Sequence, residues 1–192
     1  MELLEALTRF FKRHRFFSHR SGLPKRIDFP FLSESWDVEY RLTSRRGVMA
    51  RPASSGRLVV TGWIGDEERC RLALQRWLVR YARMHLLPRL AELSEQTGWY
   101  YRTVSVRNQR ARWGSCSTTG HISLNCKLLF LPTHLVHMVM LHELCHLVEP
   151  NHSKCFWARL CEVEPDTHRL HGQIREAGKS LPAWVNCTKA IA

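Results

Sequence analysis

The chain has 192 residues, of which 44% are hydrophobic and 24% are charged, and its formal net charge at pH 7 is +12. This length suffices for one domain with a substantial core. No run of about 18 apolar residues predicts a transmembrane helix, and the N-terminus lacks the apolar centre of a secretory signal. Seven scattered cysteines without a C-x-x-C pair argue against a disulfide framework and favour reduced thiols in a cytoplasmic protein.

The positive charge is concentrated in the first part of the chain. Residues 1–113 hold 22 of the 29 Lys and Arg residues but 11 of the 17 acidic residues, so residues 114–192 are close to neutral. A basic surface attracts polyanions at long range, which makes nucleic acid a candidate partner of the N-terminal half. The alternative is a solvated surface that keeps the protein in solution.

Residues 1–33 are predicted to form a basic, aromatic-rich N-terminal arm, and residues 34–192 to form the main domain. Leu3, Leu4 and Leu7 recur at helical spacing, and four phenylalanines lie among the basic residues that follow. Such aromatics can stack on bases or lie on an anionic membrane surface. We favour the third interpretation, a helix that packs on the core.

The middle of the chain predicts strands followed by a long helix. Apolar and polar residues alternate over 36–42, which indicates a half-buried strand. Residues 48–51 and 57–62 resemble further strands separated by a loop, and we expect an antiparallel meander. A helix is then predicted from Asp66 to about Ser94, with a leucine-rich stripe, an arginine-rich opposite face and a kink at Pro88.

Three more strands are predicted between residues 100 and 130. They cover 101–106, about 112–115 and 121–129, and residues 117–120 form the turn between the last two strands. A buried helix should follow, with Thr133 as its N-cap and Pro150 as the residue that ends it. Its residues are apolar almost all round, and Cys145 is interpreted as a small buried residue rather than a ligand.

The chemistry of the chain is concentrated in the run His142-Glu143-Leu144-Cys145-His146. Two histidines four residues apart leave the same face of a helix and can bind one metal ion. Glu143 can reach a water on that metal without coordinating it. A shuffled chain of this composition would contain roughly 0.04 such motifs, so chance is a poor explanation.

A third histidine, His152, follows the motif by six residues. Three protein nitrogens and one water describe a catalytic zinc site with an open coordination position. Two other arrangements remain open at this stage. Glu162 could replace His152 as the third ligand, since Asp166 follows it at the spacing of one zincin class, although Pro165 interrupts the helix between them. Alternatively, Glu162, Glu164 or Asp166 could orient a metal-bound imidazole.

Two segments carry a resemblance to a known family. The runs RNQRARWGSCSTTGHISLN (107–125) and HELCHLVEPNHSKCFW (142–157) resemble the YgjP-like zinc metallopeptidase domain, which is related to the SprT and WLM proteases. The resemblance implies an α+β, zincin-like fold. In it, a small, mostly antiparallel sheet packs against a backing helix and an active-site helix that carries HExxH. It also implies one zinc ion on His142, His146 and His152, with Glu143 as the catalytic base.

Further expectations concern the surroundings of the motif. In the resembling family the last strand, here 121–129, lies beside the metal cleft, where an extended peptide could pair with its edge. Phe156 and Trp157 should pack beneath the metal, and Ser153 should cap their helix. His168 and His171 are expected at the surface, although either could lean over the cleft. The polar run that ends at Arg112 could anchor substrate, supply a second oxyanion donor, or only hydrogen-bond loop carbonyls.

The sequence therefore predicts a zinc-dependent metallohydrolase, and we favour a peptidase that acts on polypeptides with Glu143 as general base. One alternative is a metal-dependent hydrolase of nucleotide phosphoanhydrides, although no glycine-rich phosphate loop is present. Another is a nucleic-acid-associated protein with a protease domain or a structural zinc site, although structural zinc normally has four protein ligands. The oligomeric state is not predicted.

Overall fold

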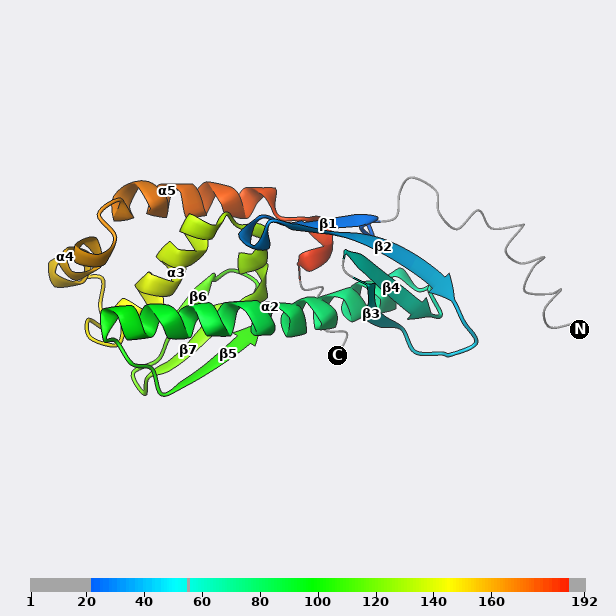
Figure 1. Ribbon diagram of the computed structural model, residues 1–192, viewed down its shortest axis with the longest axis horizontal. Helices are drawn as coiled ribbons and strands as arrows, with labels where there is room; N and C mark the ends of the chain where they lie inside the picture. The colour runs from blue at the N-terminus through cyan, green and yellow to red at the C-terminus, as the bar shows by residue number, and fades with distance from the viewer. Residues whose placement is uncertain (1–21, 55, 187–192) are drawn as a thin grey trace, which may run out of the picture.

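The computed structural model describes residues 22–54 and 56–186 of the chain. This part contains two small β-sheets and four α-helices, and α2 runs along the molecule from one sheet to the other (Figure 1). The fold is thus mixed α+β, as predicted. None of the helices described is long and apolar enough to cross a bilayer. Most of the arm predicted at residues 1–33 lies outside the described residues, so that division of the chain stays a prediction.

The first sheet has four strands in the order β1-β2-β4-β3, which are β1 (Arg26–Phe29), β2 (Glu34–Leu42), β4 (Arg57–Gly62) and β3 (Met49–Ser54). Strand β4 lies between β2 and β3, parallel to the first and antiparallel to the second. The predicted antiparallel meander was therefore wrong. Strand β4 is apolar and mostly buried, which suits a central strand, whereas β3 is largely exposed at the edge.

Helix α2 (Glu67–Thr97) begins where the sequence predicted. The side chain of Asp66, the N-cap residue, accepts a hydrogen bond from the backbone N–H of Arg69 at 3.0 Å. The helix continues through Pro88 and ends at Gly98, whose φ of 70° is a left-handed conformation that favours glycine. Its buried side packs against strands of both sheets, which joins them into one core.

Part of the positive charge on α2 is neutralised within the helix itself. Three of its arginines form ion pairs with acidic residues three positions away, namely Arg69 with Asp66, Arg71 with Glu68, and Arg89 with Glu92. Such exposed pairs contribute little stability, but they reduce the charge that the helix offers to a polyanion. Nucleic-acid binding by the N-terminal half stays a prediction.

The second sheet has three strands in the order β5-β7-β6, which are β5 (Thr103–Arg107), β7 (His121–Asn125) and β6 (Gly114–Cys116). Strand β7 pairs in parallel with β5 and antiparallel with β6. Two sheets, each with one parallel pair, thus replace the single, mostly antiparallel sheet that was expected. The predicted last strand is also shorter, because residues 126–130 form a 3-10 helix.

Three helices complete the described chain: α3 (Thr133–Cys145), α4 (Lys154–Val163) and α5 (Thr167–Ala177). Helices α2, α4, α5 and strand β6 all contact α3, and Figure 1 shows α3 between α2 and α5. The apolar side chains of α3 are therefore buried, whereas Thr133 and His134 at its N-terminal end are exposed.

Candidate metal centre

Helix α3 is held rigidly by its burial. Its apolar residues on all faces are buried, and they are Leu135, Val136, Met138, Val139, Met140, Leu141, Leu144 and Cys145. The predicted N-cap was wrong by one position, because Pro132 occupies it. The hydroxyl of Thr133 donates instead to the carbonyl of Phe31, at 3.3 Å.

The C-terminal end of α3 also differs from the prediction. The helix ends at Cys145 rather than near Pro150, and His146 is the C-cap residue, with φ −63° and ψ −14°. These angles are still near helical values, so the rings of His142 and His146 stay on one side, with centroids 4.9 Å apart. The Cys145 thiol donates weakly to the carbonyl of Phe156 (3.8 Å), so it contacts α4 rather than the rings.

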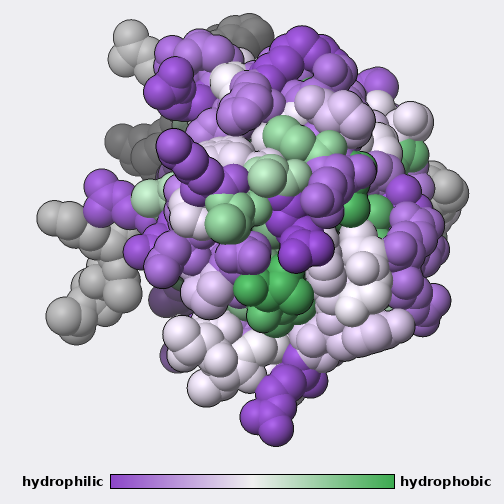
Figure 2. Space-filling view, turned by 90° about the vertical axis from the view of Figure 1, so that its left-hand side faces the viewer, coloured by the Kyte–Doolittle hydropathy of each residue, from purple (hydrophilic) through white to green (hydrophobic). Residues whose placement is uncertain are grey.

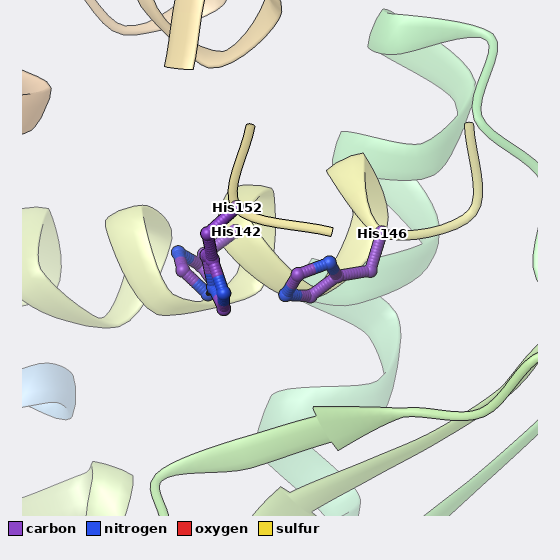
Figure 3. A group of neighbouring side chains, drawn as sticks. All are labelled: His142, His146 and His152. Atoms are coloured by element: carbon purple, nitrogen blue, oxygen red, sulfur yellow. Dashed lines mark hydrogen bonds between the residues drawn. The ribbon is translucent and has the colours of Figure 1, made fainter. Parts of the chain in front are cut away.

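The three predicted histidines meet at this end of the helix. One ring nitrogen from each of His142, His146 and His152 lies within 4.8 Å of the others. The Nε2 atoms of His142 and His152 are 2.9 Å apart, and Figure 3 shows the His146 ring directed toward the other two. Within residues 22–54 and 56–186, this is the group of three or more His, Cys, Asp or Glu that could hold a metal ion.

The rings are held from behind by a backbone carbonyl, which the sequence did not indicate, and by Phe156, which was expected at this place. The Nδ1–H of His146 donates to the backbone carbonyl of Glu149 at 3.2 Å, which leaves Nε2 available as a ligand. Phe156 is fully buried, and its ring lies 4.7 to 4.9 Å from all three imidazoles, centroid to centroid. As predicted, Ser153 caps α4, where its hydroxyl accepts from the N–H of Phe156 at 3.3 Å.

The electrostatics of the group suit a cation. Burial, and then the neighbouring histidines, lower the pKa of His142 to about 3. Burial also lowers the pKa of His146. Both imidazoles are therefore neutral at pH 7, which is the form that donates a lone pair to a metal. Three ring nitrogens within this distance fit one zinc ion, for which imidazole is a preferred ligand.

Glu143, which follows His142 in α3, directs its side chain toward β6. Its side chain is buried, and burial raises its pKa to about 7, an effect that the positive charge of Arg112 opposes. Gly114 on β6 lies against it, since a Cβ atom there would be 2.7 Å from Glu143 Oε1. Only glycine lets the strand pass this close to the carboxyl group.

A cavity of about 230 Å³ opens between these elements. Its polar lining consists of Arg112, His142, Glu143 and His171, and the rest of the lining is mainly apolar: Trp113, Gly114, Met138, Val139 and Ile174. A larger groove of about 720 Å³ lies between β3 and α2, but none of its lining residues is a His, Cys, Asp or Glu. The smaller cavity is therefore the candidate active site.

The strand beside this cavity is not the one expected. Strand β7 is central in its sheet and pairs on both sides, so it has no edge for a peptide. Strands β5 and β6 are the two edges of this sheet, and β6 is the one that contacts α3. A strand was predicted at about 112–115, which overlaps β6, but the sequence did not indicate that this short strand would form the sheet edge beside α3.

The acidic alternatives lie apart from the histidines. The carboxylate of Glu162 is exposed and 3.8 Å from the guanidinium of Arg159. Asp166 forms an ion pair with Arg169, and neither carboxylate belongs to the histidine group. The acceptor for the His146 ring is a backbone carbonyl, which sequence patterns do not reveal.

His171 on α5 lies over the cleft. Its ring centroid is 6.4 Å from that of His142 and 5.6 Å from that of Trp157, and the residue lines the cavity. The ring of His168 stacks on that of Trp157, with centroids 5.5 Å apart.

Figure 2 views the molecule from the end that α4 covers, where hydrophobic side chains gather in the middle and hydrophilic ones surround them.

The model of the YgjP-like metallopeptidase domain matches residues 7–177. The chain belongs to the YgjP-like metallopeptidase family. Membership of this family implies a divalent metal, and the three histidines are the residues that could hold it.

Two individual proteins are also similar to parts of the chain. The UTP pyrophosphatase of Escherichia coli (strain K12) is 39% identical over 44 residues, which are 23% of this chain and 26% of that protein. The chain thus matches about a quarter of that curated relative. The crystal structure of the metallopeptidase zymogen of Pyrococcus abyssi abylysin is 23% identical, with a TM-score of 0.43, and the match covers 47% of this chain and 92% of that one.

Proposed function

We propose that the protein is a zinc-dependent peptidase with a zincin-like arrangement, in which α2 backs the active-site helix α3. One observation carries the proposal: three imidazoles converge next to a cavity into which a buried carboxyl group, Glu143, projects. Structural zinc sites normally have four protein ligands, whereas three leave a position for water.

His142, His146 and His152 would hold the ion. The backbone carbonyl of Glu149 orients the His146 ring, and the ring of Phe156 packs against all three imidazoles. When bound, zinc lowers the pKa of a water molecule toward about 7 and polarises a carbonyl group. The remaining chemistry is assigned to residues of this chain. It requires a base for the water proton, an acid for the leaving amine and a surface that aligns the peptide.

Glu143 is the proposed base and acid. Its buried carboxyl group lines the cavity next to His142, within the region where water and substrate would react. It takes a proton from the attacking water and later delivers that proton to the leaving nitrogen. Because Gly114 and the core of α3 confine the side chain, its carboxyl group is held in one place.

Strand β6 supports a polypeptide substrate. It is an edge strand next to Glu143, so an extended peptide can pair with its free backbone groups by β-augmentation. The apolar part of the cavity, formed by Trp113, Met138, Val139 and Ile174, would then accept one substrate side chain. Its volume of about 230 Å³ is below the usual range for drug-sized ligands and suits one side chain.

A second candidate is hydrolysis of a nucleoside triphosphate at the same site. Two observations favour it: the partial match to a UTP pyrophosphatase, and Arg107, Arg110 and Arg112, which precede β6 and carry charges that phosphates require. We favour the peptide as substrate, because the cavity lies beside β6, an edge strand with which an extended peptide can pair.

Parallel assays test both candidates. Zinc-loaded wild type and Glu143→Gln are incubated with unfolded casein and with each nucleoside triphosphate. The proposal predicts casein cleavage by the wild type only, with equal zinc content in both proteins. Hydrolysis of triphosphate without casein cleavage would select the second candidate, and equal turnover by both proteins would remove Glu143 from the mechanism.

A further inference from the structure

Amide hydrolysis places negative charge on the former carbonyl oxygen, and a positioned hydrogen-bond donor there lowers the barrier. The cavity beside Glu143 offers two ionisable side-chain donors besides the histidine group. Arg112 lies in the loop before β6 and His171 lies on α5, so the two come from different walls.

We propose that Arg112 is a catalytic residue whose guanidinium binds the developing oxyanion. The inference rests on the proposed peptidase function. Water oxygen bonds to the carbonyl carbon, the carbonyl π pair moves onto oxygen, and Glu143 takes the water proton. As the C–N bond breaks, the carbonyl re-forms and the proton passes from Glu143 to nitrogen. Arg112 stabilises the oxygen only while it is charged.

The backbone at Arg112 is fixed before substrate arrives. Asn125 is buried, and its amide Nδ2 donates to the carbonyls of Arg112 (2.6 Å) and Gln109 (3.0 Å). The backbone N–H of Asn125 also donates to the carbonyl of Trp113 at 2.8 Å. Hydrogen bonds on both sides of Arg112 therefore tie its loop to the central strand, and such preorganisation is what oxyanion stabilisation needs.

The same loop delivers Arg112 to the reacting region. Gly114, two residues later, is in contact with Glu143, and both Arg112 and Glu143 line the cavity. In the described part of the chain, no ion pair includes Arg112, whereas Arg71 and Arg89 on α2 each pair with a glutamate. The charge of Arg112 acts on the nearby Glu143 carboxyl group, but no carboxylate among the described residues holds the guanidinium in an ion pair, so it is available to an anion, and its planar fork can bind one oxygen with two N–H groups.

Steady-state kinetics give the first test. In zinc-loaded protein, Arg112→Gln should lower kcat about 100-fold with little change in KM, because the contact exists mainly in the transition state. Arg112→Lys should recover part of this loss, since it keeps the charge without the fork. The matched control is Arg102→Gln, which removes an equal charge from an exposed residue that precedes β5, outside the cavity, and should leave kcat within about twofold.

Anion binding gives the second test, and it separates oxyanion contact from an effect on Glu143. A phosphinic dipeptide, whose charged oxygens occupy the place of the oxyanion, is titrated calorimetrically into zinc-loaded Glu143→Gln and into the double variant with Arg112→Gln. With no carboxylate left to influence, the second substitution should still weaken binding about tenfold or more.

The outcomes of these tests are distinct. If the wild type cleaves no peptide, the proposed function fails, whatever the phosphinate affinities are. If it cleaves peptides and Arg112→Gln turns over equally fast, or if both Glu143→Gln proteins bind the phosphinate equally, the role of Arg112 is refuted. Zinc content and melting temperature, measured for every variant, exclude loss of the metal or of the fold as the cause.

Discussion

Replacing Gly114 by alanine tests the contact between β6 and Glu143. A Cβ atom at residue 114 would lie 2.7 Å from both Cγ and Oε1 of Glu143 and 2.9 Å from its Cδ. Ordinary contacts of this kind begin at 3.4 Å, so the carboxyl group or the strand must move by about 0.7 Å. A misplacement of about 1 Å can cost about 100-fold in rate. We therefore expect kcat/KM to fall by about 30- to 100-fold.

The stability and metal content of this variant are expected to respond differently. Overpacking of this size destabilises a protein by about 1–3 kcal/mol, which lowers the melting temperature. Zinc content should stay at one ion, because the methyl group contacts Glu143 and none of the three histidines.

The assays are initial rates on a fluorogenic peptide, zinc analysis by mass spectrometry and thermal melting. Gly47→Ala is the matched control, since a Cβ there has nothing within 4 Å, and it should match the wild type in all three. Full activity in Gly114→Ala, with zinc bound, would show that Glu143 is not held against β6 or is not the base.

Three further predictions concern the ligands, the protonation state and the loop. Loss of a residue that only hydrogen-bonds to a metal ligand lowers metal affinity about 10- to 100-fold. His152→Ala should lower zinc affinity by more than this, whereas Glu162→Ala should leave it unchanged; the reverse result in competition titrations would make Glu162 the ligand. In metal-free protein, the folded pKa of His142 is about 3 and the unfolded value is about 6.5. The unfolded state therefore binds more protons at His142 between these values, whereas the raised pKa of Glu143 has the opposite effect on stability in the wild type. In metal-free Glu143→Gln, where that opposing effect is removed, stability should fall as pH drops below about 6.5; urea unfolding of this variant at constant stability from pH 7.5 to 5 would contradict this. Asn125→Asp keeps the side-chain oxygen that accepts from the backbone N–H of Lys127 but removes the Nδ2–H donors to the loop that carries Arg112. It should therefore lower kcat as Arg112→Gln does; an unaltered kcat would mean that this loop needs no such anchor.

The candidate site was largely predictable because its information is local. The spacing of His142 and His146 fixes their relation on any helix, and the turn at Pro150 returns His152 after few residues. The caps at Asp66 and Ser153 are likewise decided by neighbouring residues.

What could not be predicted depends on contacts distant in sequence. Alternation in β2 and the apolar run in β4 indicate which residues are buried but not which strands pair, so the parallel β2–β4 contact was missed. The approach of Gly114 to Glu143 joins residues 29 positions apart, and no pattern in either segment indicates it. The position of His171 over the cleft likewise depends on the packing of α5 on α3.

The central claim is that three imidazoles hold one zinc ion beside Glu143. Anomalous diffraction at the zinc edge, from crystals of the zinc-loaded protein, tests it most directly. We predict a single anomalous peak at about 2.0–2.1 Å from one nitrogen of each of His142, His146 and His152. A peak elsewhere, or one coordinated by Glu162 with His152 turned away, would contradict the account.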